Sequence, residues 1–439
     1  MQGPGTAFSD VLPEGVLRQL VDCHAGAYRE RVYSPLRTLG LFIGQALSAD
    51  GACQDAVARN LSERSACGVA ACSLNTGPYC KARQRLPLGL IVALLSAIGR
   101  RMEQAQPQAW RWRGRCVKLL DGTTVSMPDT PSNQEVFPQN PAQQPGLGFP
   151  LARLVAILSL GTGAVLDWAM GACQGQDTGE QALFRQLLGA LDAGDVVLAD
   201  ELYCSYWILA TLKARGVDAL MHQSVHRAYD FRRGKRLGPG DHIVQWARPP
   251  RPSWMDHETY AAMPETLSVR EVRVNGRVLV TTLLDVHTAS AVELDRLYRS
   301  RWNIEVDLRS IKAEMGMDIL RCKSPEMIRK EVAVHLLAYT LVRAVMAQAA
   351  SLAHVLARAL RFKGVVQVLN AYHQQLRHSA GQRIRIMMAY LLGAISMLRL
   401  PSRPDRVEPR AIKRRPKPHR LLLIPRPVAR LHILAHRRA

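Results

Sequence analysis

The sequence predicts a mixed α/β protein built on a central sheet, with a helical N-terminal region and a basic C-terminal tail. Three observations support this prediction. Amphipathic helical periodicity covers residues 17–104. Short apolar runs, typical of buried strands, then alternate with helical segments over residues 115–222. Helical periodicity returns at residue 290 and continues to about residue 398.

The length and charge of the chain narrow the class of protein. At 439 residues it is long enough for roughly two to four packing units. The 58 Lys and Arg residues outnumber the 36 Asp and Glu residues, giving a net charge of +22. Such an excess indicates a polyanionic partner, and nucleic acid is favoured over an acidic membrane.

Neither a membrane span nor a secretory signal is predicted. The most apolar stretch, residues 332–360, is interrupted by Arg343 and Arg358, so we expect a buried helix there. Residues 1–20 lack the basic start and apolar core of a signal peptide, so we expect a cytoplasmic protein. The nine cysteines are scattered without CxxC spacing, which favours free thiols over disulfides or a zinc site.

Residues 115–222 carry the pattern of a sheet-based core. Apolar runs at 115–127 and 154–171 predict three strands, the last two joined through a glycine-rich turn. A helix follows, then the run DVVLAD ending at Asp200, then a second helix and a further buried strand. We expect Asp121 to close the first strand and Asp200 the fourth, although each also suits an ordinary turn-forming aspartate.

Changes of pattern along the chain predict five regions. These are a helical N-terminal DNA-binding domain (1–108), the first part of the core (109–223), a β-rich insertion (224–289), the second part of the core with C-terminal helices (290–398) and a basic extended tail (399–439). The pair Asn275-Gly276 predicts a hairpin within the insertion. Ser290 and Glu293 fit a capping box, which predicts the start of the next helix.

The stretch LYRSRWNIEVDLRSIKAEMG, residues 297–316, is the strongest candidate for a functional helix. At about 100° per residue, four of its side chains share one arc, namely Tyr298, Arg301, Glu305 and Lys312. An apolar stripe expected to face the core lies beside that arc and consists of Leu297, Ile304, Leu308 and Ile311. Asp307 and Glu314 point away from both, so we expect them to be solvent-facing charges. A solvated helix with acid–base pairs is the alternative interpretation.

Three acids in a basic protein suit metal-dependent cleavage of a phosphodiester. Two Mg²⁺ ions about 3.5–4 Å apart activate the nucleophile, stabilise the leaving oxygen and screen the phosphate. Because Mg²⁺ prefers oxygen ligands and keeps several waters, three carboxylates can hold the pair. Asp121 and Asp200 at strand ends and Glu305 on a later helix are the candidates.

Taken in this order, these residues resemble the DDE catalytic core of RNase H-like transposases. The spacing of Tyr298, Arg301, Glu305 and Lys312 is similar to the YREK signature of bacterial insertion-sequence transposases of the family numbered four. Three further stretches resemble that family, namely PYCKARQRLP (78–87), DGTTVSMPDT (121–130) and RVEPRAIKRRPKP (406–418). The resemblance spans nearly the full chain and implies an RNase H-like mixed-sheet core.

The resemblance implies a role for each matching residue. Asp121, Asp200 and Glu305 would hold two Mg²⁺ ions, or Mn²⁺ in their place, for successive strand cleavage and strand transfer. Members of the family commonly form a hairpin at the transposon end and excise the element without copying it. The implied activity is cut-and-paste transposition at the inverted-repeat ends of an insertion sequence.

Contacts with DNA are also implied around the candidate acids. Tyr298, Arg301 and Lys312 would grip phosphates beside the scissile bond. Trp302 lies about 60° from Glu305 on the same face and suits stacking on an unpaired base, with a half-buried packing role as the alternative. Glu201, directly after Asp200, departs from the family pattern and could alter phosphate contacts or offer a competing metal ligand.

The partners implied by the resemblance are double-stranded DNA, including terminal inverted repeats and target DNA, and a second copy of the chain in a synaptic homodimer. The implied location is the bacterial cytoplasm, associated with the nucleoid. The basic segments 232–236 and 413–417 suit phosphate contacts, although a solubilising role is the alternative for the tail. Two rival functions remain: a non-catalytic DNA-binding protein derived from a transposase, and a structure-selective nuclease on the same core.

Overall fold

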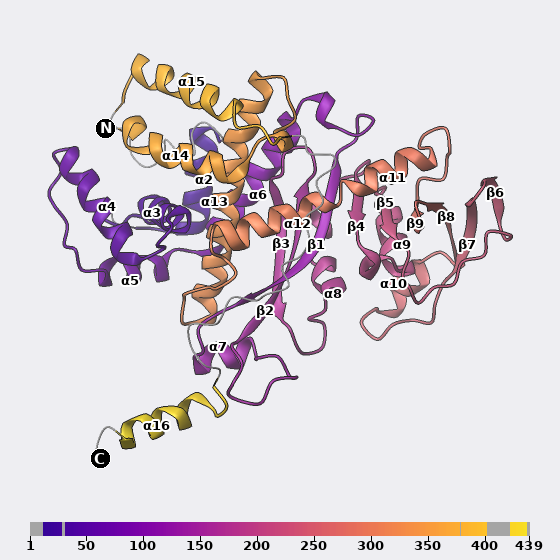
Figure 1. Cartoon of the computed structure of the whole chain (residues 1–439), viewed down its shortest axis with the longest axis horizontal. Coiled ribbons are helices and arrows are strands. Elements are labelled where there is room, and N and C mark those ends of the chain that lie inside the picture. The colour runs from indigo at the N-terminus through magenta and orange to yellow at the C-terminus, as the bar shows by residue number, and fades with distance from the viewer. Residues whose placement is uncertain (1–11, 29–30, 378, 402–421, 437–439) are drawn as a thin grey trace.

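The computed structural model describes residues 12–28, 31–377, 379–401 and 422–436. A mixed sheet of nine strands runs through the molecule, and helices cover both of its faces (Figure 1). The mixed α/β class predicted from the sequence is confirmed.

The N-terminal region is helical, as its periodicity predicted. Its helices are α2 (Glu14–Ala25), α3 (Pro35–Leu47), α4 (Cys53–Ala66), α5 (Gly77–Arg85), α6 (Leu88–Ala105) and the 3₁₀-helix η1 (Gln108–Trp110). In α6, Leu90, Leu94 and Ile98 are fully buried at intervals of four residues, as one face of a helix requires. A Cβ atom at Gly99 would lie 2.5 Å from the carbonyl oxygen of Val165, so this glycine lets α6 pack closely on the sheet.

The sheet has the order β3-β2-β1-β4-β5-β9-β8-β7-β6. Its strands are β1 (Val117–Ser126), β2 (Leu151–Ser159), β3 (Val165–Ala172), β4 (Val196–Ala199), β5 (Asp218–His222), β6 (Lys235–Gly238), β7 (Asp241–Ala247), β8 (Thr266–Val274) and β9 (Arg277–Thr281). β4 runs parallel to both β1 and β5, whereas β2 is antiparallel to both of its neighbours. This arrangement of the first five strands is that of an RNase H-like core.

The first strand is longer than predicted. Asp121 and Gly122 were expected to end it, but β1 continues through both to Ser126. Antiparallel pairing with β2 extends over this whole stretch and places Asp121 opposite Ala156. The ladder of hydrogen bonds therefore overrides the local preference of an Asp-Gly pair for a turn.

Two apolar layers enclose the core of the sheet. Leu119 and Leu198 face the cluster formed with α6 and α13 (Pro325–Leu352), whereas Leu120 and Val197 face the opposite cluster. This alternation follows the two-residue period of a strand. The second layer includes the helices α8 (Glu180–Arg185), η2 (Leu188–Ala190), η3 (Glu201–Tyr203) and α9 (Tyr206–Ala214).

Residues 224–289 extend the same sheet. β9 pairs with β5, and β8, β7 and β6 follow in turn, with α10 (His257–Ala262) beside them (Figure 1). The hairpin predicted at Asn275-Gly276 is confirmed, since both residues have positive φ between β8 and β9. The guanidinium group of Arg270 is fully buried and donates to both carboxylate oxygens of Asp241.

The C-terminal part is helical. Its elements are α11 (Ala291–Arg299), α12 (Trp302–Arg309), the π-helix η4 (Ser310–Glu314), α13, the 3₁₀-helix η5 (Ala357–Ala359), α14 (Phe362–Arg377), α15 (Gln382–Ser396) and α16 (Arg426–His436). The short helix α7 (Pro131–Val136), between β1 and β2, contacts α13. The capping box predicted at Ser290 and Glu293 is confirmed. The prediction of one continuous helix through 297–316 is wrong, because the Arg301 N–H donates to the Tyr298 carbonyl three residues back and tightens the turn between α11 and α12.

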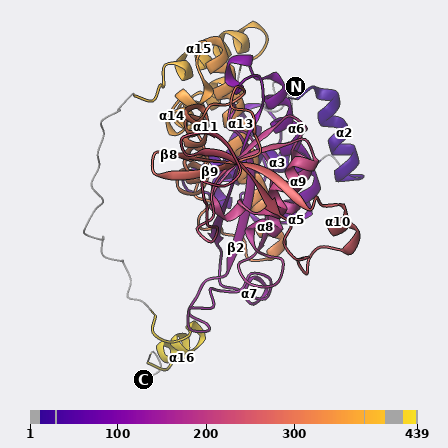
Figure 2. The same cartoon turned by 90° about the vertical axis from the view of Figure 1, so that its right-hand side faces the viewer.

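The tail is not wholly extended. Residues 426–436 form α16, which Figures 1 and 2 show set apart from the main body of the described chain. Arg426 ties this helix to Asp129 at 2.6 Å and lies 4.1 Å from the ring centre of Phe149. The basic segment 413–417 lies outside the described residues.

One helix within the described residues, α13, is long and apolar enough to cross a bilayer. Of its most apolar window, 78% is buried inside the fold. Residues such as Val332, Leu336 and Tyr339 are fully buried there, as predicted from the arginines that interrupt the stretch. We therefore assign α13 to the core.

Candidate active site

Asp121 and Asp200 lie next to each other on the sheet. The parallel pairing of β1 with β4 sets Leu119 opposite Leu198, and each aspartate follows two residues later. Two residues along a strand return to the same face, so both carboxylates project on the side of α12 and α13. Asp200 directly follows β4 and caps η3 by accepting a 2.9 Å hydrogen bond from the Leu202 N–H.

Asp121 is held in an environment that favours its protonated form. Burial raises its pKa to about 6, the Gly122 N–H lowers it through a 2.8 Å hydrogen bond, and the negative charge of Asp200 raises it again. The charge effect places Asp200 close to Asp121. Two acids in register, one with a raised pKa, are typical of a functional site.

Glu305 reaches the same region from α12. The guanidinium group of Arg301 donates from Nη2 to Glu305 Oε1 at 2.7 Å, and its Nη1 lies 3.6 Å from Asp121 Oδ2. One planar group therefore spans the two carboxylates. Only 16% of the Arg301 side chain is exposed, against 35% for Glu305.

The other residues of the predicted arc lie along the same edge. Tyr298 is buried, and the Arg301 guanidinium carbon lies 6.0 Å from its ring centre. Lys312, in the π-helix, donates to the Thr124 carbonyl at 2.8 Å and to Thr123 Oγ1 at 3.1 Å. It therefore lies over β1, two to three residues past Asp121. Single π-turns in helices are frequent at functional sites.

Trp302 and the apolar stripe complete the helix. The Trp302 side chain is 62% exposed, so the alternative of a half-buried packing role is wrong. The core-facing stripe is confirmed, since its four members are buried, namely Leu297, Ile304, Leu308 and Ile311. Trp302 is thus exposed to solvent in the first turn of α12, three residues before Glu305.

Asp307 was predicted to face solvent, and this prediction is wrong. Asp307 is fully buried and accepts hydrogen bonds from Arg358 Nη1 at 2.7 and 2.5 Å and from Arg343 Nη2 at 2.5 Å. Arg358 also donates to the Ser159 carbonyl at 3.0 Å, at the end of β2. These contacts anchor α12 to the sheet. Glu314, predicted in the same way, is exposed as expected.

A further acid, Glu180, lies near the site and was not identified from the sequence. A Cβ atom at Gly122 would lie 2.4 Å from the Glu180 carboxylate, so this side chain packs against β1 on the face opposite Asp121. The buried Tyr203 hydroxyl donates to Glu180 Oε2 at 3.1 Å. Its position in the first turn of the helix after β3 is the one local signal that could have indicated it.

Glu201, which departs from the family pattern, turns towards β5. Its Oε2 lies 3.4 Å from His222 Nδ1, and 46% of its side chain is exposed. The contact joins the ends of two neighbouring strands, β4 and β5.

The site suits divalent cations in donor type and charge. Carboxylate oxygens are the ligands that Mg²⁺ prefers, and Asp121, Asp200 and Glu305 supply them around a region that already holds the positive charge of Arg301. Among the described residues, no three His, Cys, Asp or Glu side chains converge closely enough to hold a metal ion. The Arg301 guanidinium group separates Glu305 from Asp121.

Comparison with known proteins adds independent information. A family model described as "Transposase DDE domain" matches residues 112–341, more than half of the chain. The chain is 27% identical over 344 residues to the transposase InsG for insertion sequence element IS4 of Escherichia coli (strain K12), covering 76% of each protein. It is also similar to a cryo-EM structure of the piggyBac transposase synaptic complex with hairpin DNA, at a TM-score of 0.45 and 9% identity, over 93% of this chain and 87% of that one.

The matched residues include β1 with Asp121, β4 with Asp200 and the α11–α12 segment with Glu305. The extent of that match decides the assignment. The chain belongs to the transposase DDE domain family.

Proposed function

We propose that this protein is a DNA transposase that cuts and joins strands at the inverted-repeat ends of its own insertion sequence. The observation that carries the proposal is the approach of three distant acids to one region. Asp121 and Asp200 are in register on parallel strands, and Glu305 approaches from α12 through a guanidinium group shared with Asp121. A protein that only binds DNA gains nothing from carboxylates that face phosphate.

Asp121, Asp200 and Glu305 are proposed to hold two Mg²⁺ ions, with Mn²⁺ as a substitute. When bound, such ions supply Lewis acidity at the scissile phosphate and lower the pKa of the attacking hydroxyl or water. The side chains themselves orient the ions. Asp200 is fixed by the Leu202 N–H and Asp121 by the Gly122 N–H, so each keeps one oxygen directed by the backbone.

Tyr298, Arg301, Lys312 and Trp302 are proposed to contact DNA beside those acids. Arg301 offers a planar fork suited to a phosphate, and Lys312 offers a point charge above β1. The exposed indole ring of Trp302 suits stacking on an unpaired base. Together these residues would offer phosphate contacts and a stacking surface along the segment from α11 to η4.

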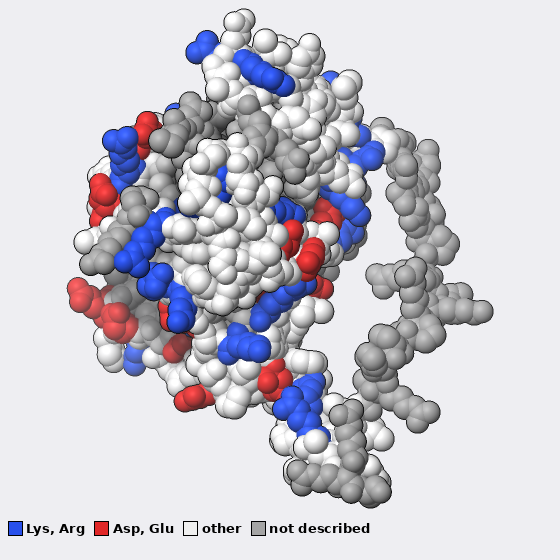
Figure 3. Space-filling model, turned by 90° about the vertical axis from the view of Figure 1, so that its left-hand side faces the viewer, with Lys and Arg blue, Asp and Glu red and all other residues white. Residues whose placement is uncertain are grey.

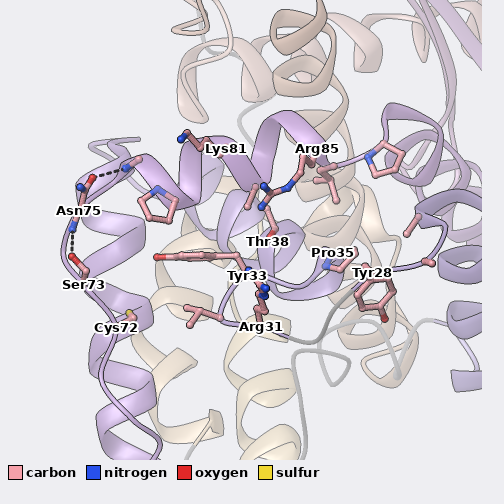
Figure 4. A pocket seen from close by; sticks show the side chains of 18 residues that line it. Tyr28, Arg31, Tyr33, Pro35, Thr38, Cys72, Ser73, Asn75, Lys81 and Arg85 are labelled. Carbon is pink, nitrogen blue, oxygen red and sulfur yellow. Dashed lines mark hydrogen bonds between the residues drawn. The ribbon is translucent and has the colours of Figure 1, made fainter.

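The N-terminal helices are proposed to hold more of the DNA. A hollow of about 1020 Å³ opens between α5 and the segment before α3. Figure 4 shows Lys81 and Arg85 of α5 along one side of it and Arg31, Tyr33 and Tyr28 along the other. None of its described lining residues is acidic. Cations beside aromatic rings suit a nucleic-acid strand.

The charges elsewhere on the surface are mixed in sign. Figure 3 shows Lys and Arg side chains interspersed with Asp and Glu on the face that it draws. Some bases of the N-terminal helices are neutralised locally; Arg59, for example, pairs with Asp55 at 2.9 Å. The hollow therefore gathers cations without acids among its described lining residues, unlike the mixed charges elsewhere.

The insertion is proposed to contribute further phosphate contacts. In the segment 232–236, Arg232 and Arg233 both lie near Asp230, at 2.9 and 3.5 Å. Lys235 and Arg236, exposed on β6, have no ion-pair partner in the described part of the chain. Of the four bases predicted to bind phosphate, these two are therefore the better candidates.

Supercoiled plasmid carrying the inverted repeats that flank the gene tests the proposal directly. Purified protein with Mg²⁺ is expected to nick and then excise the repeat-bounded segment, and EDTA is expected to prevent it. Asp121→Asn, Asp200→Asn and Glu305→Gln are each expected to abolish cleavage while retaining DNA binding. Glu265→Gln, which alters an exposed acid in the insertion, is the matched control.

The same assay separates the rival functions. Cleavage that requires the repeats supports transposition, whereas cleavage of branched DNA of any sequence supports a structure-selective nuclease. Binding without cleavage in Mg²⁺ and in Mn²⁺ supports a non-catalytic DNA-binding protein. A homodimeric synapse in the bacterial cytoplasm is part of the proposal, and cross-linking of the repeat-bound protein tests that assembly.

A further inference from the structure

We propose that Arg301 is an internal counter-ion that keeps the acidic site from taking up metal until DNA binds. In the DNA-free protein its guanidinium group holds Glu305 and Asp121. In the complex a phosphate takes over that group and frees the two carboxylates for the cations. This inference rests on the proposed function and adds an order to its binding events, with DNA before metal.

The contacts of Arg301 support its role as a counter-ion in the DNA-free protein. Its two terminal nitrogens are divided between two of the three proposed metal-binding acids, at 2.7 Å to Glu305 and 3.6 Å to Asp121. The guanidinium group is largely buried, so water screens these contacts weakly. A divalent cation bound between the same carboxylates would meet a fixed positive charge at close range. The like charges therefore disfavour metal binding while Arg301 stays between the carboxylates.

The position of Arg301 in the chain supports the transfer of its guanidinium group to a DNA phosphate. It lies in the tight turn between α11 and α12, next to the exposed Trp302. An arginine side chain is long and flexible, and its fork accepts a phosphate as readily as a carboxylate. A change of rotamer at one residue is therefore enough to move the charge from the acids to DNA lying along α12.

Two neighbouring arginines show that this arrangement is specific to Arg301. Arg299 pairs with Asp295 at 2.8 Å, and 59% of its side chain is exposed. Arg343 is buried and binds Asp307 on the core side of α12. Neither contacts one of the three acids in the described structure, so removing the charge of Arg299 provides a matched control.

The test measures Mn²⁺ binding to the full-length protein without DNA. The decrease in the electron paramagnetic resonance signal of free Mn²⁺ reports the amount bound. Arg301→Gln removes the charge and leaves a side chain of similar length. It is expected to bind Mn²⁺ about tenfold more tightly than the wild type, within the range usual for coupling between two sites. Arg299→Gln is expected to match the wild type. The gain is expected to disappear when Asp121→Asn is added to Arg301→Gln.

A second measurement locates the metal independently of any activity. Fe²⁺ with ascorbate and peroxide cleaves a polypeptide near a bound metal ion. Without DNA, Arg301→Gln is expected to be cut near residues 121 and 200 at Fe²⁺ concentrations that leave the wild type intact. Arg301→Lys keeps the charge but lacks the fork, and it is expected to resist cleavage as the wild type does. Thermal melting of each variant verifies that it is folded.

The outcomes separate this inference from the proposed function. Equal, Asp121-dependent Mn²⁺ affinity in the wild type and Arg301→Gln would overturn the counter-ion role and leave the metal site in place. An absence of Asp121-dependent binding in both proteins would overturn the counter-ion role and the proposed metal site together. Tighter binding in Arg301→Gln alone supports the inference.

Discussion

Arg358 binds both carboxylate oxygens of Asp307, at 2.7 and 2.5 Å, and Asp307 lies two residues beyond Glu305. Arg343 approaches the same carboxylate from α13. The helix that carries Glu305 is therefore fastened to two other parts of the fold by one fully buried acid.

Asp307→Asn is expected to destabilise the protein by about 3–5 kcal/mol, because it leaves the buried guanidinium groups of Arg343 and Arg358 without their counter-charge. Denaturant unfolding monitored by tryptophan fluorescence measures the decrease. Glu314→Gln, at an exposed position on the same segment, is the control and is expected to change stability by less than about 0.5 kcal/mol. A decrease at Asp307 no larger than at Glu314 would show that the buried pair contributes little.

Asp121→Asn is expected to stabilise the DNA-free protein at pH 8. Burial raises the pKa of Asp121 to about 6 from an ordinary value of 3.8. The folded chain therefore holds a proton between about pH 4 and pH 6 that the unfolded chain has released, and above that range it bears the cost of an ionised buried acid, on the order of 2–3 kcal/mol.

Asparagine removes that cost, so the gain in the free energy of unfolding should be present at pH 8 and shrink towards zero near about pH 4. Urea unfolding at both pH values measures it. Asp256→Ala is expected to change the free energy of unfolding in the opposite direction. Hydrogen bonds from Thr259 lower the pKa of Asp256, so ionised Asp256 stabilises the fold at pH 8 and this stabilisation disappears as the pH falls. A destabilised Asp121→Asn protein at pH 8 would contradict the prediction.

Gly122→Ala is expected to push the Glu180 carboxylate away from Tyr203, because the new Cβ atom would lie 2.4 Å from that carboxylate. The expected cost is about 1 kcal/mol, the contribution of one hydrogen bond. In a Tyr203→Phe background the same substitution should cost less, since the bond is already absent, and a double-mutant cycle measures the difference. Gly179→Ala, where a Cβ atom meets nothing within 4 Å, is the control. Equal costs in both backgrounds would refute the coupling.

Replacing Arg31, Lys81 and Arg85 with Gln is expected to weaken DNA binding and flatten its salt dependence. For each phosphate that is no longer neutralised, the slope of log affinity against log salt should fall by about 0.9. Fluorescence anisotropy with a labelled duplex at several salt concentrations measures this slope. A protein with Arg18→Gln and Arg59→Gln lacks only cations that are already paired, and its slope should stay close to that of the wild type. Equal slopes in the two proteins would show that DNA does not enter the hollow.

The sequence predicts best what is encoded locally. The buried run before Asp200, the hairpin at Asn275-Gly276 and the capping box at Ser290 each depend on residues within a few positions of one another. The apolar stripe of residues 297–311 follows from the helical period alone.

What the sequence cannot predict depends on contacts between distant segments. Asp121 continues a strand because β2 pairs with it, although Asp-Gly favours a turn locally. Asp307 is buried because Arg343 and Arg358 come from later in the chain. Glu180 approaches the site only across the sheet, against Gly122. Each of these requires the tertiary fold.

The insertion is joined to the core by an unbroken hydrogen-bonded sheet, since β9 pairs with β5. A duplex gripped at Lys235 and Arg236 on β6 would therefore lie at a set separation from the acids beside β4. In the proposed transposase, this continuous sheet would fix the distance along the bound DNA between that grip and the phosphodiester to be cut. Lengthening the loop at one edge strand would leave the position of cleavage unchanged. Breaking the pairing of β5 with β9 would make that position variable.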